Sequence, residues 1–168
     1  QQRDGFTTNA VTGDKIDSRD GTFTKAQVMF LPNANWEARV IHAYERDRDG
    51  DYALGDLDAI RLTPFRVSRN HQGFTNRDIN KTTINLRGTG QRFAIESTTG
   101  FISWQTDDAT DLDYSPLPLA TRTNLEEATQ FTQEVRIASP ENAPLALGSA
   151  MVKWQAGVEY FDQSYDQD

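Results

Sequence analysis

Two-residue alternation of apolar and polar side chains is the feature that most constrains this chain. In the segment 36–46, Trp36, Val40 and Tyr44 fall on one face of an extended strand, while Arg39 falls on the other. Successive side chains of a β-strand point to opposite faces, so such a segment forms a strand with one apolar side and one polar side.

The same alternation recurs along the chain, whereas helical spacing is confined to 54–62 and stops at Pro64. Further strands are predicted at 22–31, 81–87, 91–106, 129–138 and 151–161. The parity of the apolar positions changes at Gly100, which predicts a β-bulge there. The sequence therefore predicts an all-β chain, an antiparallel up-and-down meander of about six strands.

The connections predict one organised segment, 1–168, in which tight turns and long loops alternate. Its expected parts are a surface loop (1–20), hairpins at about 22–46, 81–106 and 129–161, and long loops at 47–80 and 107–128. Alternate connections of a meander lie at the same end of the sheet. Short turns at one end and long loops at the other are typical of transmembrane β-barrels.

The two faces differ in what they can contact. Arg39, Arg136 and Lys153 lie opposite the aromatic positions of their segments. A lipid-facing Arg or Lys near the bilayer midplane costs about 2–4 kcal/mol, a cost that disappears if the polar face lines a wet lumen. A soluble sheet with one core face gives the same alternation. The pattern therefore permits a membrane barrel wall or a soluble β-sandwich that binds a ligand such as a carbohydrate.

Composition excludes several partners and cofactors. The chain has 25 Asp and Glu against 17 Lys and Arg, a balance unsuited to binding nucleic acid. It has no cysteine, so disulfides and thiolate metal sites are excluded. The sequence contains no run of about 18 apolar residues, so it predicts no membrane-spanning helix.

No motif predicts an enzyme, a cofactor or a metal. The acidic run 47–51 places Gly50 fourth, where a calcium loop of the EF-hand type needs glycine sixth. A second acidic cluster, at 107–113, fits a plain polar loop better than a cation site. No nucleophile motif, zinc motif or phosphate loop occurs.

The long loop 47–80 is the best candidate for ligand contact, because arginines with aromatic side chains suit carboxylate- or catechol-bearing molecules. The candidate residues are Tyr52, Arg61, Phe65, Arg66 and Arg69. The alternative is a packed loop whose arginines pair with neighbouring aspartates.

Several stretches resemble the barrel region of TonB-dependent receptors, the outer-membrane transporters of Gram-negative bacteria. They are RDGF (3–6) with DSRD (17–20), AQVMFLPNANW (26–36), STTGF (97–101), and FTQEVRIAS (131–139) followed by KWQAGVEYF (153–161). Their order and spacing cover nearly the whole chain.

The resemblance implies part of a barrel of about 22 strands in the cell outer membrane, roughly its third to eighth strands. Such receptors take up a scarce nutrient, such as an iron–siderophore, cobalamin or a glycan. A periplasmic partner energises them through an N-terminal plug, which we expect to lie outside this segment. The expected contacts of the segment are therefore outer-membrane lipid and a small-molecule nutrient.

Overall fold

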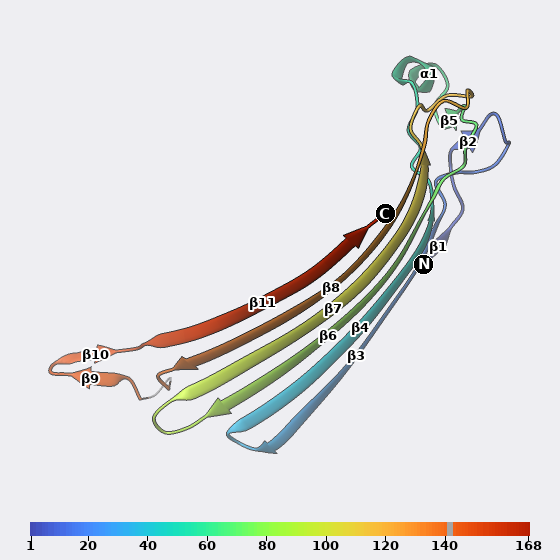
Figure 1. The fold of residues 1–168 in the computed structure, drawn as a ribbon. Coiled ribbons are helices and arrows are strands. Elements are labelled where there is room, and N and C mark those ends of the chain that lie inside the picture. The colour runs from blue at the N-terminus through green and yellow to red at the C-terminus, as the bar shows by residue number, and fades with distance from the viewer. Residues whose placement is uncertain (141–142) are drawn as a thin grey trace.

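The computed structural model describes residues 1–140 and 143–168, and its main feature is one antiparallel sheet (Figure 1). Six long strands follow the chain in order: β3 (Arg19–Asn33), β4 (Trp36–Gly50), β6 (Phe74–Thr89), β7 (Ala94–Asp111), β8 (Thr121–Ala138) and β11 (Gln155–Gln167). The short β1 (Gln2–Arg3) adds a seventh strand beside β3. The predicted antiparallel meander is confirmed. Over the described residues the sheet is open, because β11 pairs on one side only.

The remaining elements are short. β2 (Thr8–Asn9) pairs with β5 (Arg66–Val67) in parallel, and β9 (Leu145–Leu147) forms a hairpin with β10 (Ala150–Val152). The one described helix, α1 (Leu57–Leu62), lies within the predicted helical stretch, and the Asp56 carboxylate accepts the Ala59 N–H at 2.9 Å as its cap.

Within the part of the chain that the structure describes, no helix is both long enough and apolar enough to cross a membrane.

The strands run further than alternation indicates. Gly50 pairs with Phe74 and Asp111 with Thr121, so the loops expected at 47–80 and 107–128 shorten to 51–73 and 112–120. Both faces of the sheet become polar in these extensions, so the alternation disappears although the backbone ladder continues.

The predicted β-bulge at Gly100 is wrong. Gly100 pairs with Thr83 on one side and Thr132 on the other without a shift of register. The parity changes because Ile102 and Trp104 are apolar residues on the polar face. A Cβ at Gly100 would meet the Thr132 hydroxyl oxygen at 2.4 Å, so the close neighbour explains the glycine.

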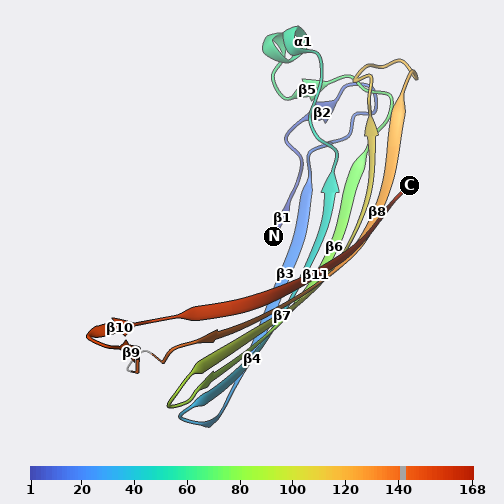
Figure 2. The same ribbon diagram turned by 60° about the vertical axis from the view of Figure 1, so that its left-hand side comes forward.

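Turns and loops separate to the two ends of the sheet (Figures 1 and 2). At the turn end, β3 meets β4 and β6 meets β7 through short connections, but β8 and β11 are joined by the longer 139–154, which carries the β9–β10 hairpin. At the other end, residues 1–18, 51–73 and 112–120 pack together, and we name them the loop cap.

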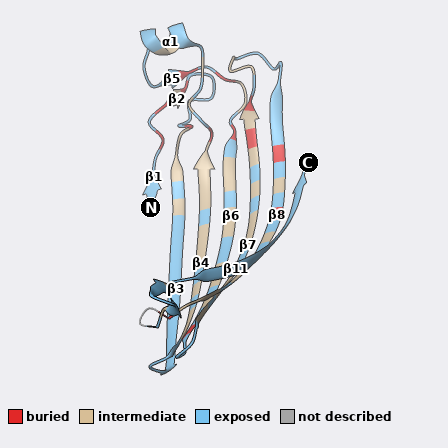
Figure 3. Cartoon of the chain, turned by 90° about the vertical axis from the view of Figure 1, so that its left-hand side faces the viewer, coloured by how far each residue is buried: buried red, intermediate tan, exposed pale blue. Residues whose placement is uncertain are grey.

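Most of the buried residues lie where the loop cap meets the strand ends (Figure 3). The buried apolar residues among those described are Ile16, Val67, Ala109 and Ala128. The expected first surface loop, 1–20, is part of this packing, because the Thr8 N–H donates to the Phe65 carbonyl at 2.9 Å. The rest of the sheet has no core above or below it.

Candidate functional site

One face of the sheet carries a band of exposed apolar side chains, which we name the apolar band and which Thr99 and Gln133 interrupt on the central strands. Cross-strand register places its members on the same face, as in the row formed by Val28, Val40 and Ile84. Exposed fractions run from 37 % at Phe131 to 69 % at Val158. The band consists of Val28, Phe30, Trp36, Val40, Ile84, Leu86, Phe101, Phe131, Val158 and Tyr160. Soluble monomers rarely leave so large an apolar surface uncovered.

The opposite face carries ion pairs along the length of the strands, together with exposed apolar residues such as Phe23, Met29 and Phe161. The pairs, from the turn end to the loop end, are Arg136–Glu134 (2.5 Å), Arg39–Glu37 (2.7 Å), Arg77–Asp47 (2.7 Å), Arg122–Asp108 (2.6 Å) and Arg19–Asp49 (2.5 Å). Their side chains are partly exposed, so each pair contributes little stability by itself. What they establish is a hydrated, charged face.

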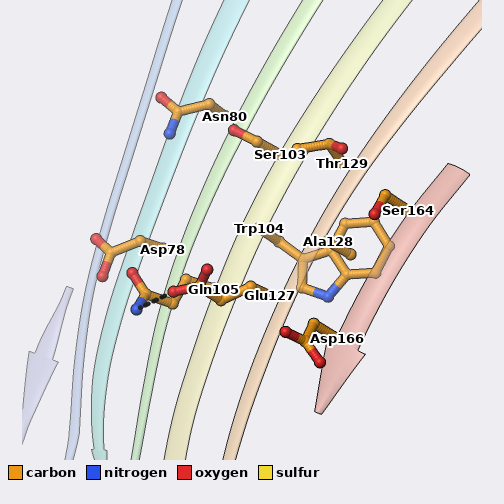
Figure 4. Close-up of a pocket in the computed structure, with 10 residues that line it drawn as sticks. All are labelled: Asp78, Asn80, Ser103, Trp104, Gln105, Glu127, Ala128, Thr129, Ser164 and Asp166. Carbon is orange, nitrogen blue, oxygen red and sulfur yellow. Dashed lines mark hydrogen bonds between the residues drawn. The ribbon is translucent and has the colours of Figure 1, made fainter.

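Between the apolar band and the loop cap, the apolar face becomes polar. A shallow hollow of about 490 Å³ spans β6, β7, β8 and β11 there, and Figure 4 shows the residues that line it. Gln105 donates to the Glu127 carboxylate at 3.0 Å, and Asp78 accepts from the Tyr44 hydroxyl at 2.7 Å. No cluster of three metal-binding side chains occurs among the described residues. The hollow therefore marks the limit of the apolar band toward the loop end of the sheet.

A buried ion pair anchors the loop cap. The Arg69 side chain is fully buried, and its Nη2 lies 3.1 Å from Asp51 Oδ2 and donates to the Tyr52 carbonyl at 2.9 Å. The Asn9 side chain holds the Arg69 backbone through two hydrogen bonds of 2.9 and 3.0 Å. The Thr110 hydroxyl donates to Asp51 from the end of β7. These contacts join three distant segments of the chain.

The structure places Arg69 inside the cap, so its guanidinium meets Asp51 and not a surface ligand, as the packed-loop alternative expected. Arg61 is exposed and lies 3.8 Å from Asp58. Tyr52 is exposed, with the Arg19 guanidinium 5.8 Å from its ring centre. The candidate ligand residues are therefore not brought together into one site.

Arg66 does line a hollow, which we name the α1 hollow. It lies between α1, β5 and the loop 112–120, and its volume is about 440 Å³. Its wall includes Ala59, Ile60, Leu62, Arg66, Tyr114 and Pro116. Phe65, one residue before Arg66, is exposed and has a left-handed backbone, with φ 61°.

Asp113 shapes the loop that supplies Tyr114. Its carboxylate accepts the Ser115 hydroxyl, the Ser115 N–H at 3.0 Å and the Ala120 N–H at 2.9 Å. These hydrogen bonds, led by that of the Ser115 hydroxyl, lower the pKa of Asp113 below its ordinary value. Asp-x-Asp followed by Ser-Pro is a turn signal, which could have directed attention to Tyr114 from the sequence.

No family model, curated protein or solved structure matches this chain.

Proposed function

We propose that this chain forms part of the wall and outer loops of a TonB-dependent receptor in the cell outer membrane, a transporter of a scarce nutrient such as an iron–siderophore, cobalamin or a glycan. The observation that carries the proposal is the uncovered apolar band, set against a paired, charged face on the other side of the same strands. Lipid would cover the apolar band, and water would solvate the charged face.

The height of the band fits a bilayer. From Trp36, the member of the band nearest the turn end, to Tyr44, which borders the band at the loop end, a strand advances roughly 27 Å at about 3.4 Å per residue. A tilt of about 40° reduces the height to roughly 20 Å, close to the apolar zone of about 25 Å on membrane barrels. Trp36 and Tyr44 stand at the two limits of the band, where rings with a polar edge suit the lipid–water interface.

Strand length supports the same arrangement. β7 and β8 have 18 residues each, whereas a tilted strand crosses a bilayer in about 9–11. The excess lies at the loop end, where the polar hollow and the loop cap are found. The strands would therefore project beyond the membrane and hold the cap in water, where a nutrient arrives.

The soluble sandwich receives less support. A sandwich needs a second sheet that faces the first across a shared core about 10 Å thick. The other sheets among the described residues are two-stranded, and the buried apolar residues are few.

In receptors of the proposed family the energising partner acts on the plug, so the wall needs no site for it.

Tryptophan fluorescence in lipid vesicles tests the proposal. Trp36 belongs to the apolar band, and Trp104 lies on the opposite face of the sheet. We expect lipids brominated on their acyl chains to quench a variant that keeps only Trp36 (W104F with W154F). The matched variant that keeps only Trp104 (W36F with W154F) should instead respond to aqueous iodide.

Equal quenching of both variants by lipid, or a stable monomer in detergent-free buffer, would contradict the membrane wall. Nutrient choice needs the parent protein: a strain that lacks it should fail to grow when its nutrient is the limiting source of iron, cobalamin or carbon. Growth equal to that of the wild type on every such nutrient would overturn the transport part of the proposal.

A further inference from the structure

The α1 hollow has the size and lining of a small-molecule site. Its volume of about 440 Å³ lies within the range of roughly 300–1,000 Å³ usual for such sites. Ala59, Ile60 and Leu62 of α1 form one wall, and Pro116 lies on the opposite loop. Apolar walls with few polar groups are typical of pockets that select a ligand by shape and one or two charges.

Two aromatic residues beside the hollow have strained backbones. Tyr114 lines it with φ 52°, and Phe65, next to the lining residue Arg66, has φ 61°. Among the described residues these are the only non-glycine positions with positive φ. Bulky residues rarely adopt this conformation. Strained residues persist only where the surrounding structure holds them in place, and they are common at binding sites.

Among the described residues, Arg66 is the one cationic side chain that lines the hollow, and it has no ion-pair partner. Its guanidinium makes no hydrogen bond or ion pair with the described residues, whereas Arg69 is paired with Asp51 and Arg61 lies beside Asp58. The acidic lining residue, Asp56, already uses its carboxylate to cap α1. The hollow therefore offers a free positive charge above an apolar floor.

The frame around the hollow is fixed on both sides. The buried Asp51–Arg69 pair holds the loop that carries α1 and β5, and the Asn70 N–H donates to the Ser115 carbonyl at 3.1 Å across to the loop of Tyr114. Asp113 fixes that second loop through its own hydrogen bonds. A preformed hollow binds without the entropic cost of ordering its walls.

We propose that the α1 hollow binds a small molecule that joins an apolar ring to a carboxylate, with the carboxylate on Arg66 and the ring between α1 and Tyr114. The planar guanidinium offers parallel N–H donors that match a carboxylate. The inference rests on the proposed function only in treating this molecule as the nutrient or its recognised part.

Calorimetric titration with 2-naphthoate tests this assignment, using the 168-residue chain in detergent micelles and empty micelles as the blank. We expect saturable binding of 2-naphthoate and at least tenfold weaker binding of the neutral 2-naphthamide. Arg66→Gln should weaken 2-naphthoate binding at least tenfold. Ala59→Trp, which fills the hollow, should remove the binding of both probes.

Arg61→Gln is the matched control, because it removes the same charge from the outer side of α1 and should leave the affinity unchanged. Equal loss in R66Q and R61Q would show general electrostatics and overturn the site. Equal binding of the acid and the amide would overturn the role of Arg66, and absence of saturable binding would overturn the hollow as a ligand site.

The two proposals fail separately. The tryptophan experiment reports the apolar band, whereas the titration reports the loop cap at the end of the strands. Lipid contact at Trp36 without 2-naphthoate binding leaves the barrel wall standing and removes the hollow. Binding at the hollow in a chain that is monomeric without detergent leaves a ligand site on a soluble protein.

Discussion

At the scale of single residues, the fully buried Arg69 joins distant segments of the loop cap. Arg69→Met keeps a long side chain but leaves the Asp51 carboxylate buried without its cation. Breaking a buried pair in this way costs about 3–5 kcal/mol. We expect fast amide exchange throughout 51–73 while the central strands stay protected, measured by hydrogen exchange and mass spectrometry.

The control for that variant is Arg61→Gln, whose side chain is 70 % exposed and whose pair with Asp58 is long. It should change exchange little, since exposed pairs contribute at most about 1 kcal/mol. If R69M left the exchange of 51–73 as slow as in the wild type, the Asp51–Arg69 pair would not be the anchor of the cap.

Phe65 permits a test of backbone strain that is separate from side-chain packing. Its side chain is exposed, so Phe65→Ala and Phe65→Gly remove the same contacts, but only glycine removes the Cβ that the left-handed backbone opposes. We expect the glycine variant to unfold with a free energy about 1 kcal/mol higher than the alanine variant, from urea titration. Equal values would mean that φ at this position relaxes in solution.

At the scale of elements, the loop 112–120 depends on an ionised Asp113. Its hydrogen bonds with Ser115 and Ala120 hold its pKa below the ordinary value, so they stabilise the folded loop above the unfolded-state pKa, about 3.9. That stability is lost as the pH falls through the folded pKa. We expect an unchanged Ala120 amide NMR signal from pH 7 to about 5 and a shift below about 4.

Asp113→Asn provides the comparison, because an amide keeps the size of the carboxylate but does not titrate in this range. The Ala120 signal should lose its acid shift in this variant. A shift of the same size in D113N would assign the titration to another group.

The central parts of the strands were predictable from the sequence, whereas their ends were not. In 36–46, residues of the apolar band alternate with residues of the charged face. The sequence therefore predicted this strand and its antiparallel pairing within the meander. Beyond Tyr44 both faces are polar, and pattern alone placed the loop boundary too early. The error at Gly100 has a related cause, since parity cannot distinguish a slipped register from an apolar residue such as Trp104 on the polar face.

The candidate site was predictable only in part, because it depends on contacts between distant segments. Arg66 was among the expected ligand residues and does line a hollow, but Tyr114 reaches that hollow from a different loop. Nothing in the pattern around Arg69 distinguishes it from Arg66, although one is buried and the other exposed. The buried Arg69 contacts Asn9 and Asp51, and Asn9 lies far away in the chain.

At the scale of the whole molecule, the open sheet needs something to cover both its apolar band and its edges. Unpaired edge strands are templates for association, and β3 and β11 offer long stretches of unpaired backbone. β11 carries only acidic charges, while the middle of β3 carries Lys25. In the proposed membrane wall, lipid would cover the band and further strands of a barrel would cover the edges.

Two neighbouring residues on β4 distinguish a lipid face from a soluble one. Val40 belongs to the apolar band and Ile41 to the charged face. In a bilayer, Val40→Arg should reduce the free energy of unfolding from vesicles by about 2–4 kcal/mol, whereas Ile41→Arg, on the hydrated side, should cost much less. A sheet with both faces in water predicts a small cost for both variants, because Arg at the exposed Val40 would stay hydrated. Urea titration of both variants in vesicles therefore tests whether lipid covers the apolar band.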